Sequence, residues 1–272
     1  MNRTTMRNQG LEAERLRLRY DPHGPPVIDD GSLQIPVGKI SALIGANGSG
    51  KSTLLKALAR QLPPESGRII LDGCDIAALA PRQLARKLGI LFQEHIAPRD
   101  LTVQQLIFHG RYPHLGLFES PTPEDHAAVE TALQIADLEG LRHRPLGELS
   151  GGQLQLAWIA MALAQSPSYL LLDEPTTFLD IAHQFDVMDL ILRLNRKLGK
   201  TIVIVVHDLN LAARYADHVF ALRAGKLVAS GEPSKVMSVD TLRYVFDVEM
   251  RMIRNEADQT FFCIPIRRAG PR

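Results

Sequence analysis

Residues 45–52 read GANGSGKS and constrain the fold of this chain more than any other segment. An apolar run, residues 39–44, precedes them, and a helical pattern, residues 52–62, follows them. The segment matches the pattern G-x-x-x-x-G-K-[ST]. Glycines let the backbone curl until its N–H groups point inward at phosphate oxygens, and the helix N-terminus adds a positive dipole end. This context favours a strand–loop–helix phosphate site over a glycine-rich turn that only caps a helix.

Each part of this segment, the Walker A motif, has a predicted task. Lys51 is expected to reach the β- and γ-phosphates of ATP, and the Ser52 hydroxyl is expected to hold Mg²⁺. The remaining residues expected to contact the nucleotide are Gly45, Asn47, Gly48, Ser49, Gly50 and Thr53.

A pair of carboxylates follows a later apolar run. Residues 169–172 read YLLL, and Asp173 and Glu174 come directly after them. Ligands of open α/β sheets bind at the carboxyl edge of the strands. Asp173 is therefore expected to hold Mg²⁺ through water, and Glu174 to polarise the attacking water as general base. Taken alone, the pair would more often be an acidic turn that ends a strand, and the Walker A motif is what favours the catalytic interpretation.

The order of the patterns indicates an α/β protein. Short apolar strands alternate with helices, which predicts a P-loop NTPase core with a mostly parallel sheet. Residues 16–20 alternate apolar and basic side chains, which suits an edge strand, and we expect an N-terminal antiparallel β part. Residues 101–165 are helical except for a proline-rich interruption at 111–123. We expect one domain, residues 1–272, with a helical subdomain inserted at about 94–165.

Composition limits the possible partners. The chain has 31 Lys and Arg against 30 Asp and Glu, so its net charge of +1 gives no support for nucleic acid as a partner. Cys74 and Cys263 match no metal spacing and are expected to be free thiols. No apolar run approaches the ~20 residues of a membrane-spanning helix. The N-terminus lacks the apolar region of a secretory signal. Any role at a membrane would therefore depend on other chains.

Residues 149–153 read LSGGQ. In one interpretation Ser150 caps a helix and Gln153 reaches back to it, as in a capping box. Two glycines at a capped helix start also make an anion site. The segment resembles the signature motif of the ABC ATPases, and its spacing to Asp173 resembles theirs. This similarity runs from Tyr20 to about Ser230.

The resemblance assigns further residues in chain order. Tyr20 stands where the family places the aromatic ring that stacks on adenine. Gln93 resembles the Q-loop glutamine, a catalytic and Mg²⁺-sensing residue, and Asp180 the D-loop aspartate. His207 resembles the switch histidine, which contacts the γ-phosphate and holds the attacking water. Taken alone, Tyr20 would be interpreted as a half-buried strand aromatic and His207 as a core histidine.

The resemblance also implies a head-to-tail homodimer. The signature of one subunit would close on the ATP that Lys51 of the other holds. The signature residues assigned to the nucleotide in this way are Ser150, Gly151, Gly152 and Gln153. The chain departs from the family at residues 154–156, where LQL replaces the frequent RQR, and at Phe178, where a small residue is frequent.

Three segments resemble one group of ABC ATPases more than the others. Residues 110–114 (GRYPH), 174–184 (EPTTFLDIAHQ) and 207–212 (HDLNLA) are similar to the ATPases of ferric-siderophore, haem and vitamin B12 importers, with the siderophore branch most similar. This implies an ATPase on the cytoplasmic face of the bacterial inner membrane. Its partners would be integral-membrane permease subunits and, indirectly, a periplasmic or lipid-anchored substrate-binding protein.

Other functions stay open at this point. Haem or vitamin B12 import and an exporter ATPase are alternatives within transport. A non-transport ABC ATPase acting on nucleic acid or the ribosome is disfavoured by the neutral charge, the single Walker A motif and the short chain between residues 51 and 173. Four apolar residues would either pack inside the helical subdomain or line a groove for the permease: Tyr112, Leu115, Leu117 and Phe118.

Overall fold

The computed structural model describes residues 10–93, 96–116, 119–255 and 261–269. The chain forms two compact units, residues 1–79 with 205–272 and residues 80–204. Residues 94 and 95, at the start of the expected helical subdomain, and Leu117 and Phe118 lie outside the described residues.

The first unit contains an antiparallel sheet whose strand order is β2-β1-β4-β5. Its strands are β1 (Leu11–Leu18), β2 (Ile28–Ile35), β4 (Ser66–Leu71) and β5 (Cys74–Asp75). β1 lies between β2 and β4 and buries every second residue over most of its length. This arrangement confirms the antiparallel β part expected near the N-terminus, but the expected edge strand is wrong, because β1 pairs with a strand on each side.

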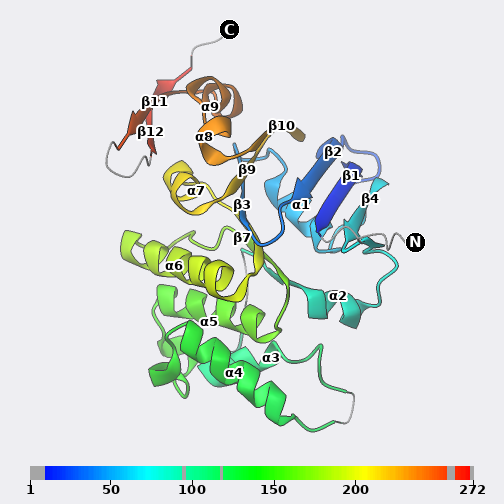
Figure 1. The fold of residues 1–272 in the computed structure, drawn as a ribbon, viewed down its shortest axis with the longest axis vertical. Helices are drawn as coiled ribbons and strands as arrows, with labels where there is room; N and C mark the ends of the chain where they lie inside the picture. Colours follow the sequence, from blue (N-terminus) through cyan, green and yellow to red (C-terminus); the bar gives the residue numbers. More distant parts are fainter. Residues whose placement is uncertain (1–9, 94–95, 117–118, 256–260, 270–272) are drawn as a thin grey trace, which may run out of the picture. The chain divides into compact units, whose positions relative to one another are not determined.

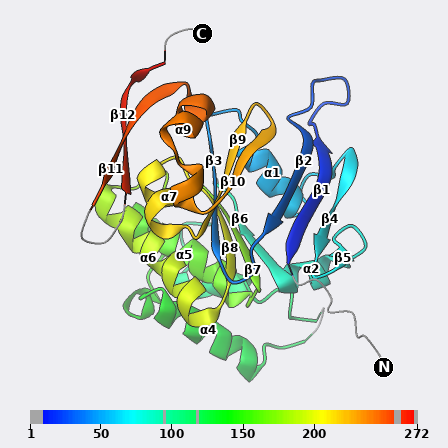
Figure 2. The ribbon, with the colours of Figure 1, turned by 45° about the horizontal axis from the view of Figure 1, so that its top comes forward.

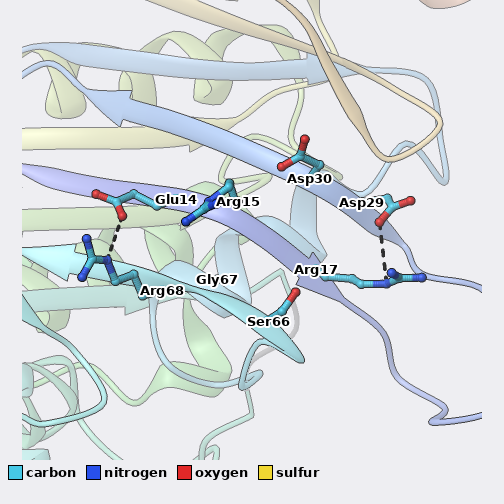
Figure 3. Close-up of a pocket in the computed structure, with 8 residues that line it drawn as sticks. All are labelled: Glu14, Arg15, Arg17, Asp29, Asp30, Ser66, Gly67 and Arg68. Atoms are coloured by element: carbon cyan, nitrogen blue, oxygen red, sulfur yellow. Dashed lines mark hydrogen bonds and ion pairs between the residues drawn. The ribbon is translucent and has the colours of Figure 1, made fainter.

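A bulge interrupts β1 where it crosses β4. Arg15 takes a left-handed φ of 47° there, and the register shifts between Glu14 and Arg17. Gly67 of β4 is required at this point, because a Cβ on it would lie 2.4 Å from the carbonyl oxygens of Glu14 and Arg15. Figure 3 shows the charged groove of about 720 Å³ beside the bulge. Arg68 pairs with Glu14 there at 2.7 Å.

Three further strands of the first unit carry the order β10-β9-β3. β3 (Ile40–Gly45) is buried at every residue and runs parallel to β9 (His218–Arg223). β9 and β10 (Lys226–Gly231) form an antiparallel hairpin around Ala224 and Gly225, which both have positive φ.

The helices of the first unit are α1 (Lys51–Leu58), α7 (Leu209–Tyr215), α8 (Pro233–Val236) and α9 (Val239–Phe246). The chain then forms a two-stranded ribbon, β11 (Val248–Arg254) and β12 (Phe261–Arg268), which lies next to α9 and α7 (Figure 2).

The second unit contains the parallel strands β6 (Leu88–Leu91) and β7 (Tyr169–Asp173), with β8 (Thr201–Val205) beside β7. Its helices are α2 (Pro81–Lys87), α3 (Val103–His109), α4 (Pro123–Ile135), α5 (Gly151–Ala164) and α6 (Ile181–Leu198), with short 3₁₀ turns at Glu139–Leu141 and Leu146–Glu148. α5 is apolar on nearly every side because α3, α4 and α6 all pack against it (Figure 1).

In the parts of the chain that the structure describes, no helix combines the length and the apolar character needed to cross a bilayer.

Candidate functional site

The GANGSGKS segment connects β3 to α1 in the first unit, as the sequence predicts. Gly48 and Gly50 have φ of 76° and 100°, a conformation that residues with a side chain rarely adopt. A Cβ on Gly50 would also lie 2.6 Å from Cδ1 of Ile28. The loop therefore depends on glycine at these two positions.

The Lys51 side chain is buried inside this loop. Its Nζ donates to the carbonyl oxygens of Gly45 and Ala46, at 2.9 and 3.1 Å. The buried Ser49 hydroxyl makes no hydrogen bond with any residue the structure describes. Asn47 and Gly48 are exposed at the tip of the loop. The Lys51 ammonium and the Ser49 hydroxyl are therefore donors inside a glycine-rich loop of the kind whose backbone N–H groups bind anions.

Tyr20 lies next to the start of α1. It follows the end of β1 and its side chain is 59% exposed, so it does not fit the alternative of a half-buried strand aromatic. Its hydroxyl lies 3.2 Å from the buried Thr53 hydroxyl. Ser52, between Lys51 and Thr53, is half-buried. The structure thus brings Tyr20 and the Walker A helix together.

His207 lies two residues after the end of β8 and is exposed, which does not fit the alternative of a core histidine. The next residue, Asp208, caps α7 by accepting the backbone N–H groups of Asn210 and Leu211. The position of His207 is therefore fixed on one side by a buried strand and on the other by a capped helix.

Two carboxylates end β7 in the second unit. Asp173 is the last residue of the strand and is buried, whereas Glu174 is half-buried and has a left-handed φ of 53°. The Glu174 Oε2 accepts hydrogen bonds from the Gln93 amide at 2.8 Å and from the Thr177 hydroxyl at 3.1 Å. These two donors hold the carboxylate in one orientation.

The sequence pattern did not single out Thr177. Its only signal is its place three residues after Glu174, within the segment EPTTFLD. Side-chain hydrogen bonds across such a turn are common for threonine.

The LSGGQ segment starts α5. Ser150 and Gln153 form the capping box: the Gln153 backbone N–H donates to the Ser150 hydroxyl at 3.2 Å, and the Ser150 N–H donates to the Gln153 side chain at 3.1 Å. The helix start leaves Ser150 and Gly151 exposed and Gly152 buried. The Gln153 side chain is thus committed to capping.

Asp180 caps the next helix, α6. Its Oδ1 accepts the backbone N–H of His183 at 2.9 Å and lies 2.8 Å from the His183 ring Nδ1. These hydrogen bonds, the backbone one first, lower the pKa of the exposed Asp180 carboxyl.

The predicted site residues divide between the two units. The first unit holds Tyr20, the Walker A residues and His207, and the second holds Gln93, Asp173, Glu174, Asp180 and the signature. No cluster of three or more His, Cys, Asp or Glu side chains suited to a metal occurs among the described residues. The oxygen donors of Ser52, Gln93 and Asp173 are of the kind that Mg²⁺ prefers.

Comparison with known proteins gives a consistent answer. The family model described as "ABC transporter" matches residues 28–177. The chain is 46% identical to the achromobactin transport ATP-binding protein CbrD of Dickeya dadantii, over 90% of this chain and 91% of that protein. It is 42% identical to the ferric enterobactin transport ATP-binding protein FepC of Escherichia coli, over 96% of each chain.

Solved structures agree. A chain described as a metal-chelate type ABC transporter in an inward-facing conformation is 28% identical and superposes with a TM-score of 0.82, covering 95% of this chain and 98% of that one. A dimeric structure of the ATP-binding cassette MJ0796 bound to ADP and Pi is 27% identical, with a TM-score of 0.70 and coverage of 82% and 98%. The chain therefore belongs to the ABC transporter family and carries its ATPase domain.

Proposed function

We propose that this chain is the ATP-binding and ATP-hydrolysing subunit of an importer whose cargo is a ferric siderophore. The hydrolytic part rests on one observation, the Glu174 carboxylate held by Gln93 and Thr177 directly after β7. The cargo is supported by the names of the relatives, one for achromobactin and one for ferric enterobactin, which align over at least 90% of each chain.

In this proposal the Walker A loop holds the phosphates of ATP. Lys51 now donates to two neutral carbonyl oxygens, and the charged β- and γ-phosphate oxygens are stronger acceptors that would replace them. The Ser49 hydroxyl and loop N–H groups would gain partners, and the helix start would add its dipole. The exposed Tyr20 ring, whose hydroxyl meets Thr53, would stack on adenine.

Hydrolysis needs a base that is oriented before the reaction. Glu174 would accept a proton from water while the water oxygen bonds to the γ-phosphorus. The bond between the γ-phosphorus and the bridging oxygen would break, and its electron pair would leave with ADP. Gln93 and Thr177 keep the carboxylate from rotating away, and His207 would contact the γ-phosphate and hold the water.

A magnesium site fits the donor types present. Ser52 and Gln93 would hold Mg²⁺ through their side-chain oxygens, and Asp173 would do so through water. When bound, the ion would offset the negative charge of the β- and γ-phosphates.

A second copy of the chain completes the proposal. Ser150, Gly151 and Gly152 of one copy would contact the ATP held by Lys51 of the other, with Gln153 fixing the helix start and Asp180 beside it. The dimeric ATP-binding cassette supports this assembly. The pair would bind the permease at the cytoplasmic face of the inner membrane, and a substrate-binding protein would deliver the cargo on the other side.

The experiment compares three proteins reconstituted with the candidate permease in lipid vesicles: wild type, Glu174→Gln and Glu139→Gln. The control makes the same chemical change at an exposed glutamate that begins a 3₁₀ turn. ATP-dependent uptake of a radioactive iron siderophore is followed together with phosphate release. Because loss of a general base costs about 10²–10⁴-fold in rate, Glu174→Gln should bind ATP and lose both activities.

The outcomes separate the two parts of the proposal. Full phosphate release by Glu174→Gln would refute the assignment of the base. Normal ATPase activity without siderophore uptake by wild type would keep the ATPase and exclude this cargo, and haem or vitamin B12 would be tested next.

A further inference from the structure

We infer that His183 is a positioning residue that ties the D-loop carboxylate, Asp180, to the signature helix at Gly152. This inference rests on the proposed function, because it assigns His183 a part in the same nucleotide site. All three residues belong to the second unit. We refer to them as the 152/180/183 cluster.

The first contact in the cluster fixes the imidazole ring. Asp180 Oδ1 accepts the His183 backbone N–H at 2.9 Å and lies 2.8 Å from the ring Nδ1. One carboxylate oxygen therefore binds the same histidine twice, once through its backbone and once through its side chain. The His183 side chain is 35% exposed and that of Asp180 66%, so the imidazole is the more enclosed of the two groups.

The second contact places the ring against the signature helix. A Cβ built on Gly152 would lie 2.0 Å from Cδ2 of His183 and 2.4 Å from its Cγ. Gly152 is an ordinary helical residue, so its backbone conformation does not explain why it lacks a side chain. The approach of the His183 ring does explain it.

The neighbouring glycine gives the contrast. A Cβ on Gly151 would meet Cδ2 of Leu179 at 3.7 Å, which is an ordinary contact. Within this chain, only the second of the two signature glycines is therefore closed to a side chain by a neighbour from the α6 start. The close contact and the hydrogen bond together make the starts of α5 and α6 one block.

The block formed by the two helix starts contains residues of the proposed dimer surface. Asp180 and the exposed start of α5 both belong to the surface that the proposed dimer uses. If His183 sets their relative position, its loss should weaken ATP-dependent dimerisation and leave ATP binding to the single subunit unchanged. If the ring only filled space, its loss would not weaken dimerisation selectively while ATP binding stayed unchanged.

Three substitutions distinguish the hydrogen bond from the bulk of the side chain. His183→Asn keeps a donor at the δ position, His183→Leu keeps carbon atoms there without a donor, and His183→Ala removes both. Each is made in the Glu174→Gln background, and the ATP-bound dimer is measured by sedimentation. We expect about tenfold more ATP to be needed with Ala and Leu, the loss typical of a hydrogen bond to a charged group, and less than about twofold more with Asn.

Nucleotide affinity of the monomeric protein, measured with a fluorescent ATP analogue, should stay within about twofold of the parent for all three, since His183 lies outside the Walker A loop. Dimerisation that is unchanged in His183→Ala would overturn the inference, as would an equal loss in His183→Asn.

A second measurement tests the contact itself. Gly152→Ala should lower the melting temperature when His183 is present and lower it much less in the His183→Ala protein, because the clashing ring is gone. Additive effects of the two changes would show that the ring does not close this position.

The proposed function has its own readout in the same experiment. If Glu174→Gln forms an ATP-dependent dimer that Lys51→Ala abolishes, the proposed function stands whatever His183 does. If Glu174→Gln does not dimerise with ATP at all, both the proposed dimer and the inference built on it fail.

Discussion

At the scale of single residues, a buried arginine explains a segment that the sequence singles out only by resemblance. Arg111, in GRYPH, donates from Nε to Asp125 Oδ1 at 2.8 Å and from Nη1 to the Ala164 carbonyl at 2.7 Å. The two side chains of the ion pair are 8% and 4% exposed. A Cβ on Gly110 would collide with the Met161 carbonyl oxygen at 2.1 Å. Gly110 and Arg111 are therefore explained by packing between α3, α4 and α5.

This ion pair predicts an acid-dependent stability. The backbone N–H of Thr122 and then Arg111 hold the pKa of Asp125 at about 2, below its ordinary 3.8, although burial acts in the opposite direction. A lowered pKa adds stability that is fully present above the ordinary value and is lost as the pH falls from about 3.8 towards 2. Asp125→Asn should therefore be destabilised at pH 6 and approach wild type across that interval.

Urea unfolding at a series of pH values measures this. Removing one partner of a buried pair typically costs about 3–5 kcal/mol, which sets the expected difference at pH 6. Asp137→Asn is the control, since its pair with Arg193 at 2.6 Å is more exposed. A constant difference between Asp125→Asn and wild type from pH 6 to pH 2 would contradict the assignment.

The Walker A lysine gives a prediction at the same scale. Lys51→Ala should weaken ATP binding by about 10–100-fold, since hydrogen bonds between charged groups are worth about 1.5–3 kcal/mol. Lys56→Ala removes a lysine from the same helix, α1, and should bind ATP like wild type. The ATP affinity of both variants can be measured by titration calorimetry. Wild-type affinity in Lys51→Ala would contradict the assignment of Lys51 to phosphate binding.

At the scale of helices and strands, segments with a clear apolar pattern were predicted correctly from the sequence. The apolar run at residues 169–172 predicts a strand that ends at the Asp173 carboxylate, and β7 spans Tyr169–Asp173. The sequence does not predict β2, whose sequence IDDGSLQI has two aspartates and a glycine, although Leu33 and Ile35 alternate into the core. α7 has only seven residues, too few for a clear helical period. The helix expected to reach residue 62 ends at Leu58, because Arg60 takes a φ of 58°.

The site shows the same division between local and tertiary information. Lys51, Glu174 and the capping box around Ser150 follow from residue types within one short segment. The contact of His183 with Gly152 joins two helix starts that lie far apart in the sequence, and no spacing rule reveals it. The motifs therefore predicted the groups to which we assign chemistry, and the structure added neighbouring groups that hold them in place.

The C-terminal ribbon offers a prediction for one element. Asn210 of α7 accepts the Cys263 backbone N–H of β12 at 2.8 Å and donates to its carbonyl at 3.4 Å. Burial raises the pKa of the Cys263 thiol to about 11, so it should react slowly with iodoacetamide. Asn210→Ala should loosen β12 and speed this alkylation, with exposed Cys74 as the internal reference. An unchanged ratio of the two labelling rates would show that Asn210 does not secure the ribbon.

At the scale of the whole molecule, the division of the site between two units matters for the proposed cycle. The phosphate loop and Tyr20 belong to one compact unit, and Glu174 and the signature belong to the other. In the proposed cycle, binding of phosphates and activation of water would thus depend on different parts of the chain. The proposed dimer adds a second copy of each part, so ATP would act as a ligand that stabilises one assembled state over another.

Binding to a permease involves the whole molecule, and substitution of a single exposed residue, Tyr112, can test it. Tyr112 is 57% exposed, and its ring stacks on that of His109 with centroids 5.0 Å apart. The ring is thus held in place and still presents much of its surface, as an interface aromatic does. If it lines the permease groove, Tyr112→Ala should reduce co-purification of the permease about tenfold while ATP binding stays normal.

The matched control is Tyr244→Ala, which removes a tyrosine that is 42% exposed on α9 of the other unit, where Arg223 lies over the ring. Tagged permease is captured from detergent extract, and the bound ATPase is quantified for both variants. The expected tenfold loss corresponds to about 1.4 kcal/mol, a cost that only a minority of interface residues reach, so a loss specific to Tyr112 would identify it as an anchor of the interface. Equal recovery of both variants would mean that Tyr112 serves only the packing of its own subdomain, and that the permease is held by other residues.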